Sequence, residues 1–375
     1  MSRFFLPILC VISLVFVPAA GPGPSKQKPP PSLILESANN NESSLSNGEF
    51  ISILRGNVVF VYDDIRIRSD EATWWRNKGA VMFNNNIKVV RGRQQLTCRK
   101  MNFAKENNLL AATGNFDFFD STEQSRLRGD DAEYRITSRN FRIKGHPVLI
   151  RYDTACGETL TINSLSMYYV DSLKRATATD SVRIRKGILF ATCRLAHYWT
   201  KTNTAFLRGT PEIRYGIHHV SGDSMNLNFS KESLRDASVV GSSHGVYADT
   251  SSGKRGDTAY THLWGDSLYM AVSDSGRLDV LWTIGKASSN NFRTSEPAIA
   301  NTASGKIMML GFGSDGNVKN LKIWGNARST YFVDDPNGRG CNEVSGDSVA
   351  VLFSQGKTRF VRLAGSTRGL YYSVP

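Results

Sequence analysis

The sequence of 375 residues contains only five cysteines, no two of them close together, and it has no Ala-rich or Glu-rich run. The scattered cysteines exclude the closely spaced pairs of a structural zinc site. Without helix-favouring runs, the abundant Gly, Ser, Thr, Asn and Asp favour strands and turns. Beyond the N-terminal stretch, no apolar run is long enough to cross a membrane as a helix.

Patterns typical of an active site are also missing. None of the histidines stands at a metal-ligand or triad spacing, and His218 and His219 would point to opposite faces of a strand. Residues 311–316 match the letters of a dinucleotide-binding fingerprint, but an alternating strand pattern follows where a helix should begin. We therefore predict a hairpin turn there, no enzymatic activity and no cofactor or metal.

The formal net charge is +13. Such a surplus points to an anionic partner such as nucleic acid, anionic lipid or acidic glycan. A basic chain that its charge merely keeps soluble is the alternative.

The first stretch predicts the compartment. Arg3 precedes a short apolar core over 4–17, and Val17-Pro18-Ala19 forms a small-residue cleavage site. This order is typical of a secretory signal peptide over residues 1–19, with retention as a membrane anchor as the alternative. In an oxidising compartment the remaining cysteines permit two disulfides, whose pairing the sequence does not define. These cysteines are Cys98, Cys156, Cys193 and Cys341.

Residues 20–47 are rich in Pro and Asn, which predicts a flexible linker, so ordered structure is expected from about Phe50. From there the sequence repeats, with a spacing of about 30 residues up to Leu227 and about 40 afterwards. One half of the repeat is a strand pattern entered through a Gly-Asp or Ser-Asp step, and the other half turns on a glycine. Examples are Gly129-Asp130, Gly222-Asp223 and Gly265-Asp266 for the first half, and Gly56-Asn57, Gly114-Asn115 and Gly325-Asn326 for the second.

Apolar residues alternate within each repeat, as a strand with one buried face requires. They fall two and four places after the Asp and three places before it, which are positions of opposite parity. Both sets face the same side only if a bulge or kink lies at the Gly-Asp step. We assign the repeated Asp residues to these bends, because calcium-binding β-rolls need shorter and denser repeats.

The apolar row is either an ordinary core or the lining of an open trough. The repeat has two strand halves and no third layer to cover them, which favours a trough. Large, adaptable side chains in the row suit a flexible chain as the guest. The trough-facing candidates are Ala72, Trp74, Met101, Phe103, Ala132, Tyr134, Leu165, Met167, Leu195, Met225 and Leu227.

The ordered series of these motifs resembles the OstA/LptA family of periplasmic lipopolysaccharide-transport proteins. The residues that carry the resemblance are 54–60, 67–72, 86–89, 323–331, 343–348 and 365–372. The resemblance implies an all-β, extended, folded-over β-jellyroll, or β-taco, built from repeated antiparallel strand pairs that shield lipid acyl chains. It implies lipopolysaccharide or a related anionic lipid as ligand, and end-to-end β-strand addition to other transport proteins.

The same resemblance implies self-association through those open edges, no nucleic-acid partner, and a periplasmic location with inner- or outer-membrane association left open. It predicts two OstA-like modules, 48–248 and 258–375. The chain has more repeats than the short bridge protein of the family and lacks the C-terminal barrel of the outer-membrane translocon. Two alternatives stay open: a membrane-anchored component of the same pathway, and a structural or glycan-binding β-solenoid with a closed core. Candidates for the lipid phosphates, or else for a solvated strand face, are Arg66, Arg68, Lys88, Arg91 and Arg93.

Overall fold

A computed structural model describes most of the chain after residue 32. The predicted signal peptide, residues 20–32 of the expected linker and Cys156 lie outside the described residues. The described ranges are 33–107, 109–122, 124–135, 137–138, 140–152, 159–187, 189–199, 201–202, 204–230, 233–249, 257–273, 277–335, 338–354 and 357–374.

These ranges form antiparallel β-strands and one short 3-10 helix, η1 (Asp171–Leu173), which confirms the predicted all-β class. No helix among the described residues has the length and apolar character of a membrane span. The strands up to residue 186 are β1 (Leu33–Ser37), β2 (Asn40–Ser46), β3 (Glu49–Tyr62), β4 (Ile65–Trp75), β5 (Ala80–Arg91), β6 (Gln94–Ala104), β7 (Leu109–Asp120), β8 (Ser125–Arg135), β9 (Asn140–Lys144), β10 (Val148–Tyr152), β11 (Thr159–Asn163), β12 (Ser166–Val170) and β13 (Arg175–Lys186). The later strands are β14 (Leu189–Trp199), β15 (Thr204–Arg208), β16 (Glu212–Tyr215), β17 (His218–Ser221), β18 (Ser224–Ser230), β19 (Ser233–Asp249), β20 (Ala259–Val272), β21 (Leu278–Arg293), β22 (Glu296–Phe312), β23 (Val318–Asp335), β24 (Gly338–Ser354), β25 (Lys357–Ala364) and β26 (Arg368–Val374).

The chain divides into two compact units. The N-terminal unit holds the described residues up to Gly187 together with His197–Lys201, and the C-terminal unit holds those of Ile188–Ala196 and Thr202–Pro375. The division therefore differs from the expected modules 48–248 and 258–375. The reason is that β19 and β20 pair along nearly their whole length and hold the two sides of the expected boundary in one unit.

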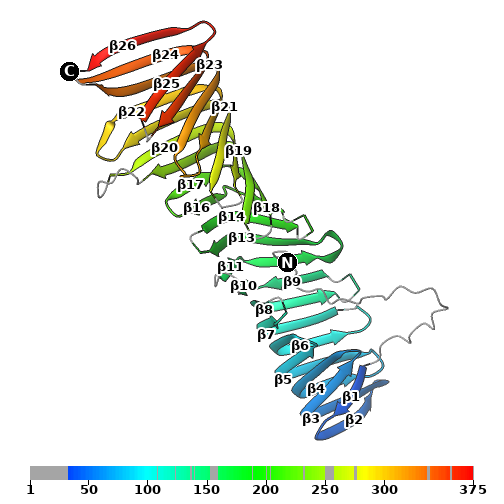
Figure 1. The fold of residues 1–375 in the computed structure, drawn as a ribbon. Helices are drawn as coiled ribbons and strands as arrows, with labels where there is room; N and C mark the ends of the chain where they lie inside the picture. The colour runs from blue at the N-terminus through cyan, green and yellow to red at the C-terminus, as the bar shows by residue number, and fades with distance from the viewer. Residues whose placement is uncertain are drawn as a thin grey trace, which may run out of the picture. The chain divides into compact units, whose positions relative to one another are not determined.

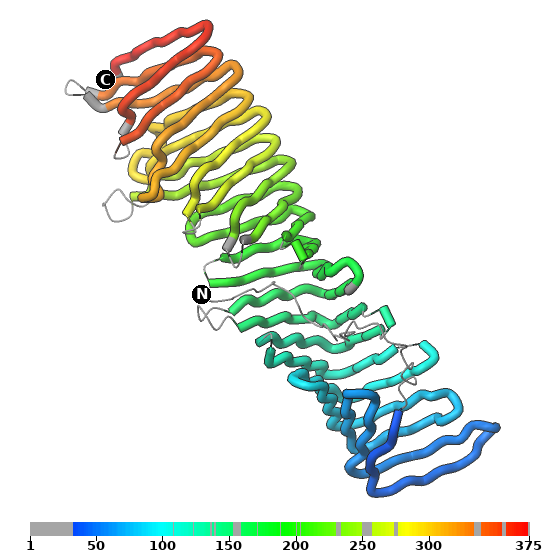
Figure 2. Tube along the Cα trace, turned by 45° about the vertical axis from the view of Figure 1, so that its right-hand side comes forward, coloured from blue at the N-terminus to red at the C-terminus, as the bar shows by residue number. Residues whose placement is uncertain are grey.

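In each unit consecutive strands lie side by side, and most strands bend near the middle (Figures 1 and 2). The bend divides the unit into two facing halves of sheet, which we call wall A and wall B. In the N-terminal unit, wall A contains 49–55, 71–75, 80–84, 100–104, 109–113 and 131–135, and wall B contains 58–62, 65–69, 87–91, 94–98, 116–120 and 125–129. In the C-terminal unit, wall A contains 233–240, 267–272, 278–284, 307–312, 318–324 and 348–354, and wall B contains 243–249, 259–264, 287–293, 296–304, 327–335 and 338–346.

The bend is a bulge, as the parity of the sequence predicted. The β3–β4 register shifts between Arg55 and Val58, where Gly56 and Asn57 have φ values of 74° and 47°. A pair of left-handed residues recurs on alternate strands, at 85–86, 114–115, 145–146, 180–181, 209–210, 241–242, 285–286 and 325–326. Because the bulge switches parity, the apolar residues on both sides of it face the interior.

The expected linker differs from the structure over residues 33–46. There β1 pairs with wall B of β3 and β2 pairs with wall A of β3, so together they form the first bent edge of the sheet. Leu33 and Leu35 pack against the core, whereas all of β2 is exposed. Amino-acid composition does not identify such an edge strand, because backbone hydrogen bonds hold it and its side chains can be polar.

The core of the N-terminal unit lies between its walls. Phe60 of wall B meets Trp74 and Phe83 of wall A edge to face, with each pair of ring centroids 5.4 Å apart. The ring centroid of Phe116, on wall B, lies 5.8 Å from that of Phe141 on β9. Aromatic pairs at such distances fill the space next to the bend and hold the walls together.

Candidate functional site

The predicted trough residues differ in exposure. Six of them are buried: Ala72, Met101, Phe103, Ala132, Met225 and Leu227. Trp74, Tyr134 and Met167 face inward but stay partly exposed where they pack against that core. A guest between the walls therefore meets the partly exposed side chains first.

Two candidates do not face inward. Leu165 is 44% exposed at a bend, where its backbone N–H donates to the carbonyls of Thr179 and Asp180, as that of Asp223 does to Val240 and Gly241. Leu195 lies three residues from the buried Tyr198 on one strand, so it faces the outside. In both cases the bend lacks a Gly-Asp step, and the parity was counted from the wrong residue.

Additional inward-facing residues line the mouth, by which we mean the ends of the two walls away from the bend. Leu110 stands opposite Tyr134 on wall A, and Tyr62 stands opposite Ile65 on wall B. All four are partly exposed and pack against the core, and the same is true of Leu96. Sequence reasoning missed Tyr62, Ile65, Leu96 and Leu110, because it followed the alternation only from the Asp side of each bend.

The guanidinium groups of Arg76 and Arg91 contact other side chains at the mouth. The guanidinium of Arg76 lies 5.0 Å from the ring centroid of Phe50 and 4.7 Å from that of Trp74, and its Nε donates to Oγ of Ser52. On wall B, Nε of Arg91 donates to Oδ2 of Asp64 at 2.7 Å, and only 14% of the arginine side chain is exposed. Arg76 is a position that the sequence did not suggest.

The other phosphate candidates lie elsewhere. Arg68 and Lys88 are directly opposite each other on the outer face of wall B. Arg66 shares that face and pairs with Glu36 at 2.6 Å, and Arg93 is exposed in the turn between β5 and β6. Arg66, Arg68 and Lys88 therefore match the alternative of a solvated strand face, whereas Arg91 and the turn residue Arg93 lie at the mouth.

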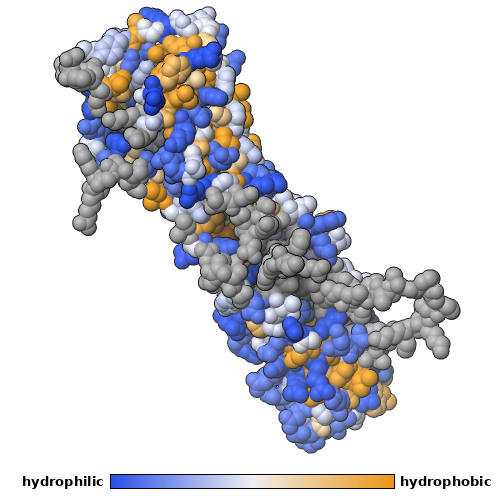
Figure 3. All heavy atoms as spheres, in the orientation of Figure 1, coloured by the Kyte–Doolittle hydropathy of each residue, from blue (hydrophilic) through white to orange (hydrophobic). Residues whose placement is uncertain are grey.

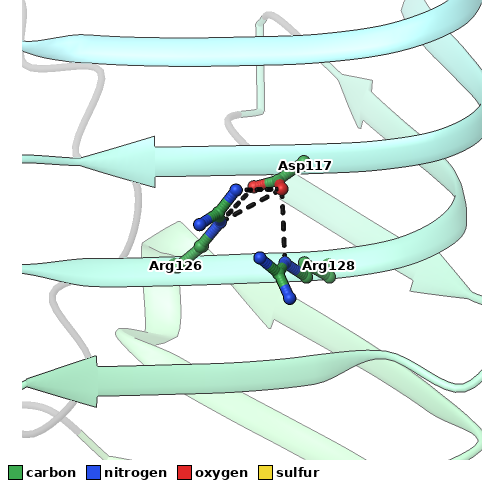
Figure 4. A network of polar contacts seen from close by, with 3 residues as sticks. All are labelled: Asp117, Arg126 and Arg128. Carbon is green, nitrogen blue, oxygen red and sulfur yellow. Dashed lines mark hydrogen bonds and ion pairs between the residues drawn. The ribbon is translucent and has the colours of Figure 1, made fainter.

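The outer face of wall B also carries a compact charge network (Figure 4). Asp117 accepts hydrogen bonds from Arg126, at 2.6 Å to Nη2, and from Nε of Arg128 at 3.2 Å. Burial alone would raise the pKa of the Asp117 carboxyl, but its hydrogen bonds to the two arginines and their charges lower it below the ordinary value.

The described cysteines are free thiols, so the expectation of two disulfides finds no support among them. Cys98 and Cys193 are buried inside the sheet, which raises the pKa of Cys98 to about 12 and that of Cys193 to about 11. Cys341 is partly exposed. Among the described residues, no group of three or more His, Cys, Asp or Glu is arranged to hold a metal ion.

The interior of the C-terminal unit differs between its walls. Wall A presents apolar side chains such as Met308 and Ile323, both buried. On wall B, Nδ2 of Asn291 donates to Oγ1 of Thr261 at 2.8 Å, and Oδ1 of Asn301 accepts from the Phe332 backbone N–H at 2.9 Å. Wall B therefore combines this polar network with buried apolar residues such as Leu263 and Ala327.

A tyrosine joins the two walls of the C-terminal unit. Tyr247 of wall B donates its hydroxyl to the carbonyl of Gly316 at 3.0 Å, in the turn that follows wall A of β22. Its ring stacks on His218, with centroids 5.0 Å apart, and lies 5.4 Å from Phe312. Residues 313–317 thus form a turn as predicted for the glycine-rich segment, and the turn is held across the mouth.

Comparisons with known proteins do not assign the chain to a family. No model of a protein family matches the chain, and no curated protein matches its sequence. Among solved structures, LptH from Pseudomonas aeruginosa, described as the LptA-homologous periplasmic component of the lipopolysaccharide transport device, is similar over 39% of this chain and 82% of that chain, with 12% identity and a TM-score of 0.21. A likeness at that level carries no argument, so function is argued below from the residues of this chain.

Proposed function

We propose that this chain is a non-catalytic periplasmic carrier or bridge in lipopolysaccharide transport to the outer membrane, and that it holds acyl chains at the mouth between its walls. The observation that supports this most is the set of inward-facing apolar side chains left partly exposed at the mouth of the N-terminal unit. A core closed by its own side chains would bury them. Each buried CH₂ of an acyl chain contributes about 0.8 kcal/mol, so several contacts suffice for binding without catalysis.

Cations at the same mouth suit a phosphorylated lipid. Arg76 and Arg91 lie at the ends of opposite walls, and a guanidinium binds phosphate through paired N–H donors. Arg91 would exchange its contact with Asp64 for the phosphate.

The edges of the sheet support assembly with other proteins or with a second copy. In the described part of the chain, β1 and β2 pair only with β3, and β25 and β26 pair only with β24. Each set presents a free backbone edge to which another β-strand can add. End-to-end addition of this kind would build a bridge, and an N-terminal segment kept in the membrane would anchor it.

The test is native mass spectrometry of the full chain purified from a periplasm. We expect a stoichiometric lipid A-type adduct that is lost in Leu96→Gln and Leu110→Gln. Ala111→Gln is the matched control, because Ala111 neighbours Leu110 on β7 but faces outward. Wild-type protein that stays free of lipid even after lipopolysaccharide is added would contradict the proposal and favour the closed-core solenoid. The same spectrum tests anchoring, because an N-terminus at Ala20 excludes a retained membrane segment.

A further inference from the structure

The outer face of wall A in the C-terminal unit is apolar. Across β20 to β23, one row of paired residues reads Ser267, Ile284, Ile307, Trp324, and the next row reads Tyr269, Trp282, Met309, Lys322. These residues alternate with the buried Leu268, Thr283, Met308 and Ile323, so they point away from the interior. Trp282 and Trp324 stack on each other, with ring centroids 5.7 Å apart and an interplanar angle of 11°.

The equivalent outer face in the N-terminal unit is ordinary. Across β5 to β8 its two rows read Asn84, Lys100, Thr113, Asp131 and Met82, Asn102, Ala111, Glu133. Strands of the same architecture therefore present charges and amides in one unit, and tryptophan, isoleucine and methionine in the other. The apolar outer face is a property of the C-terminal unit and is not a consequence of the fold.

This face is accessible. Ile284 is 43% exposed, and Leu352 and Phe360, which continue the face onto β24 and β25, are also exposed. On the side that Figure 3 shows, hydrophobic side chains gather over the C-terminal unit near β23 and β24. The remaining large apolar side chains of the two rows are partly exposed. A contiguous apolar surface that solvent reaches marks an interaction site.

The charges within the face are positive. Lys322 stands in the second row, and Arg362 lies in the same row two strands further on, with Ala350 between them. Both are exposed. The bend beside the face carries charges of both signs, because Asp266 lies against Gly285, Lys306 against Gly325 and Asp347 against Gly365. A second copy docked on the same face would bring its cations toward Lys322 and Arg362, which disfavours self-pairing and favours an anionic partner.

Tryptophan and tyrosine beside lysine and arginine are typical of the interface between a membrane and water. The aromatic rings sit at the level of the headgroups, and the long basic side chains reach the anionic phosphates. We propose that this aromatic face (Tyr269, Trp282, Ile284, Ile307, Met309 and Trp324) docks on the surface of an anionic lipid bilayer. Docking on a bilayer goes beyond the proposed carriage of lipid. It does not depend on that function, because none of these six side chains faces the space between the walls.

The experiment is co-sedimentation of the full chain with phosphatidylcholine vesicles prepared with and without phosphatidylglycerol. We expect binding that requires the anionic lipid and weakens with added salt. Ile284→Ser should weaken partitioning about tenfold, because a largely exposed side chain can be removed without unfolding the sheet. Ile53→Ser is the control, since Ile53 is 38% exposed on the outer face of wall A in the other unit.

Charge is tested separately. The double variant Lys322→Glu, Arg362→Glu should weaken binding by about tenfold or more. The control Lys100→Glu, Arg142→Glu makes the same change of net charge on the outer face of wall A in the N-terminal unit and should bind nearly as the wild type does. An equal loss in both double variants would show that only net charge matters and would overturn the proposal.

Two other outcomes would also overturn the proposal. Wild-type protein that does not sediment with anionic vesicles has no bilayer-docking face. Self-association in sedimentation equilibrium that Ile284→Ser abolishes would assign the face to a second copy. Leu96→Gln and Leu110→Gln separate this proposal from the lipid carrier, because they should lose bound lipid and still dock on vesicles.

Discussion

The carboxylate of Asp223 lies over the α-carbon of Gly241 on the neighbouring strand, in the place that a β-carbon of residue 241 would occupy. The same relationship joins Asp130 to Gly145, Asp266 to Gly285 and Asp347 to Gly365. The glycine has a left-handed φ in each of these pairs, whereas the Asp does not. The Asp of the repeated Gly-Asp step therefore serves the bend of the next strand.

Replacement of Gly241 tests this relationship. Gly241→Ala should lower the free energy of unfolding by about 1–2 kcal/mol for the φ of 77° and by a further 1–3 kcal/mol or so for overlap with Asp223. Gly316→Ala isolates the first cost, because Gly316 has a φ of 80° and no atom within 4 Å of the added carbon. Urea unfolding should show that Asp223→Ala recovers part of the loss in the double variant. No recovery would mean that the carboxylate and the glycine are not coupled.

The sequence predicted the bends well because two chemical requirements mark them. The first left-handed residue of a bend is usually Gly, as at Gly56, and the second is Asn at Asn57 but His, Thr, Ser or Lys at other bends; close approach favours Gly on the next strand. The glycine of the Gly-Asp step is needed for space and not for a left-handed φ, because a β-carbon on Gly129 would lie 2.6 Å from Cγ2 of Ile143.

Other features left no local trace in the sequence. Phe103 is buried and Leu110, its direct partner on the next strand, is partly exposed, so exposure depends on the side chains that face each residue from the opposite wall. The bends at Leu165 and Arg194 lack the Gly-Asp step, so the parity beyond them was misplaced. Backbone pairing and a few polar side-chain contacts, such as Glu42 with Arg55, hold β2 in place, and composition does not report on pairing.

Asp117 should stabilise the N-terminal unit in a pH-dependent way. Its pKa is lowered in the folded state, so its contribution is complete above the unfolded value of about 3.9 and is lost as the pH falls through the folded value. Asp117→Asn should lower the free energy of unfolding by about 0.5–1 kcal/mol at neutral pH, since the pair is partly exposed. Urea titrations at neutral and acidic pH should show that the difference from wild type disappears in acid. A difference that persists there would assign the effect to packing.

Tyr247 should hold the turn at residues 313–317 across the mouth of the C-terminal unit. Tyr247→Phe removes the hydroxyl that donates to Gly316 but keeps the ring on His218 and Phe312, so about 1 kcal/mol of local stability should be lost. Hydrogen exchange should accelerate in that turn and stay unchanged in β5 and β6. Tyr215→Phe is the control, because Tyr215 is half exposed on β16. If the turn exchanges no faster, the bond does not hold it. If it does, the hydroxyl of Tyr247 restrains the turn that follows β22.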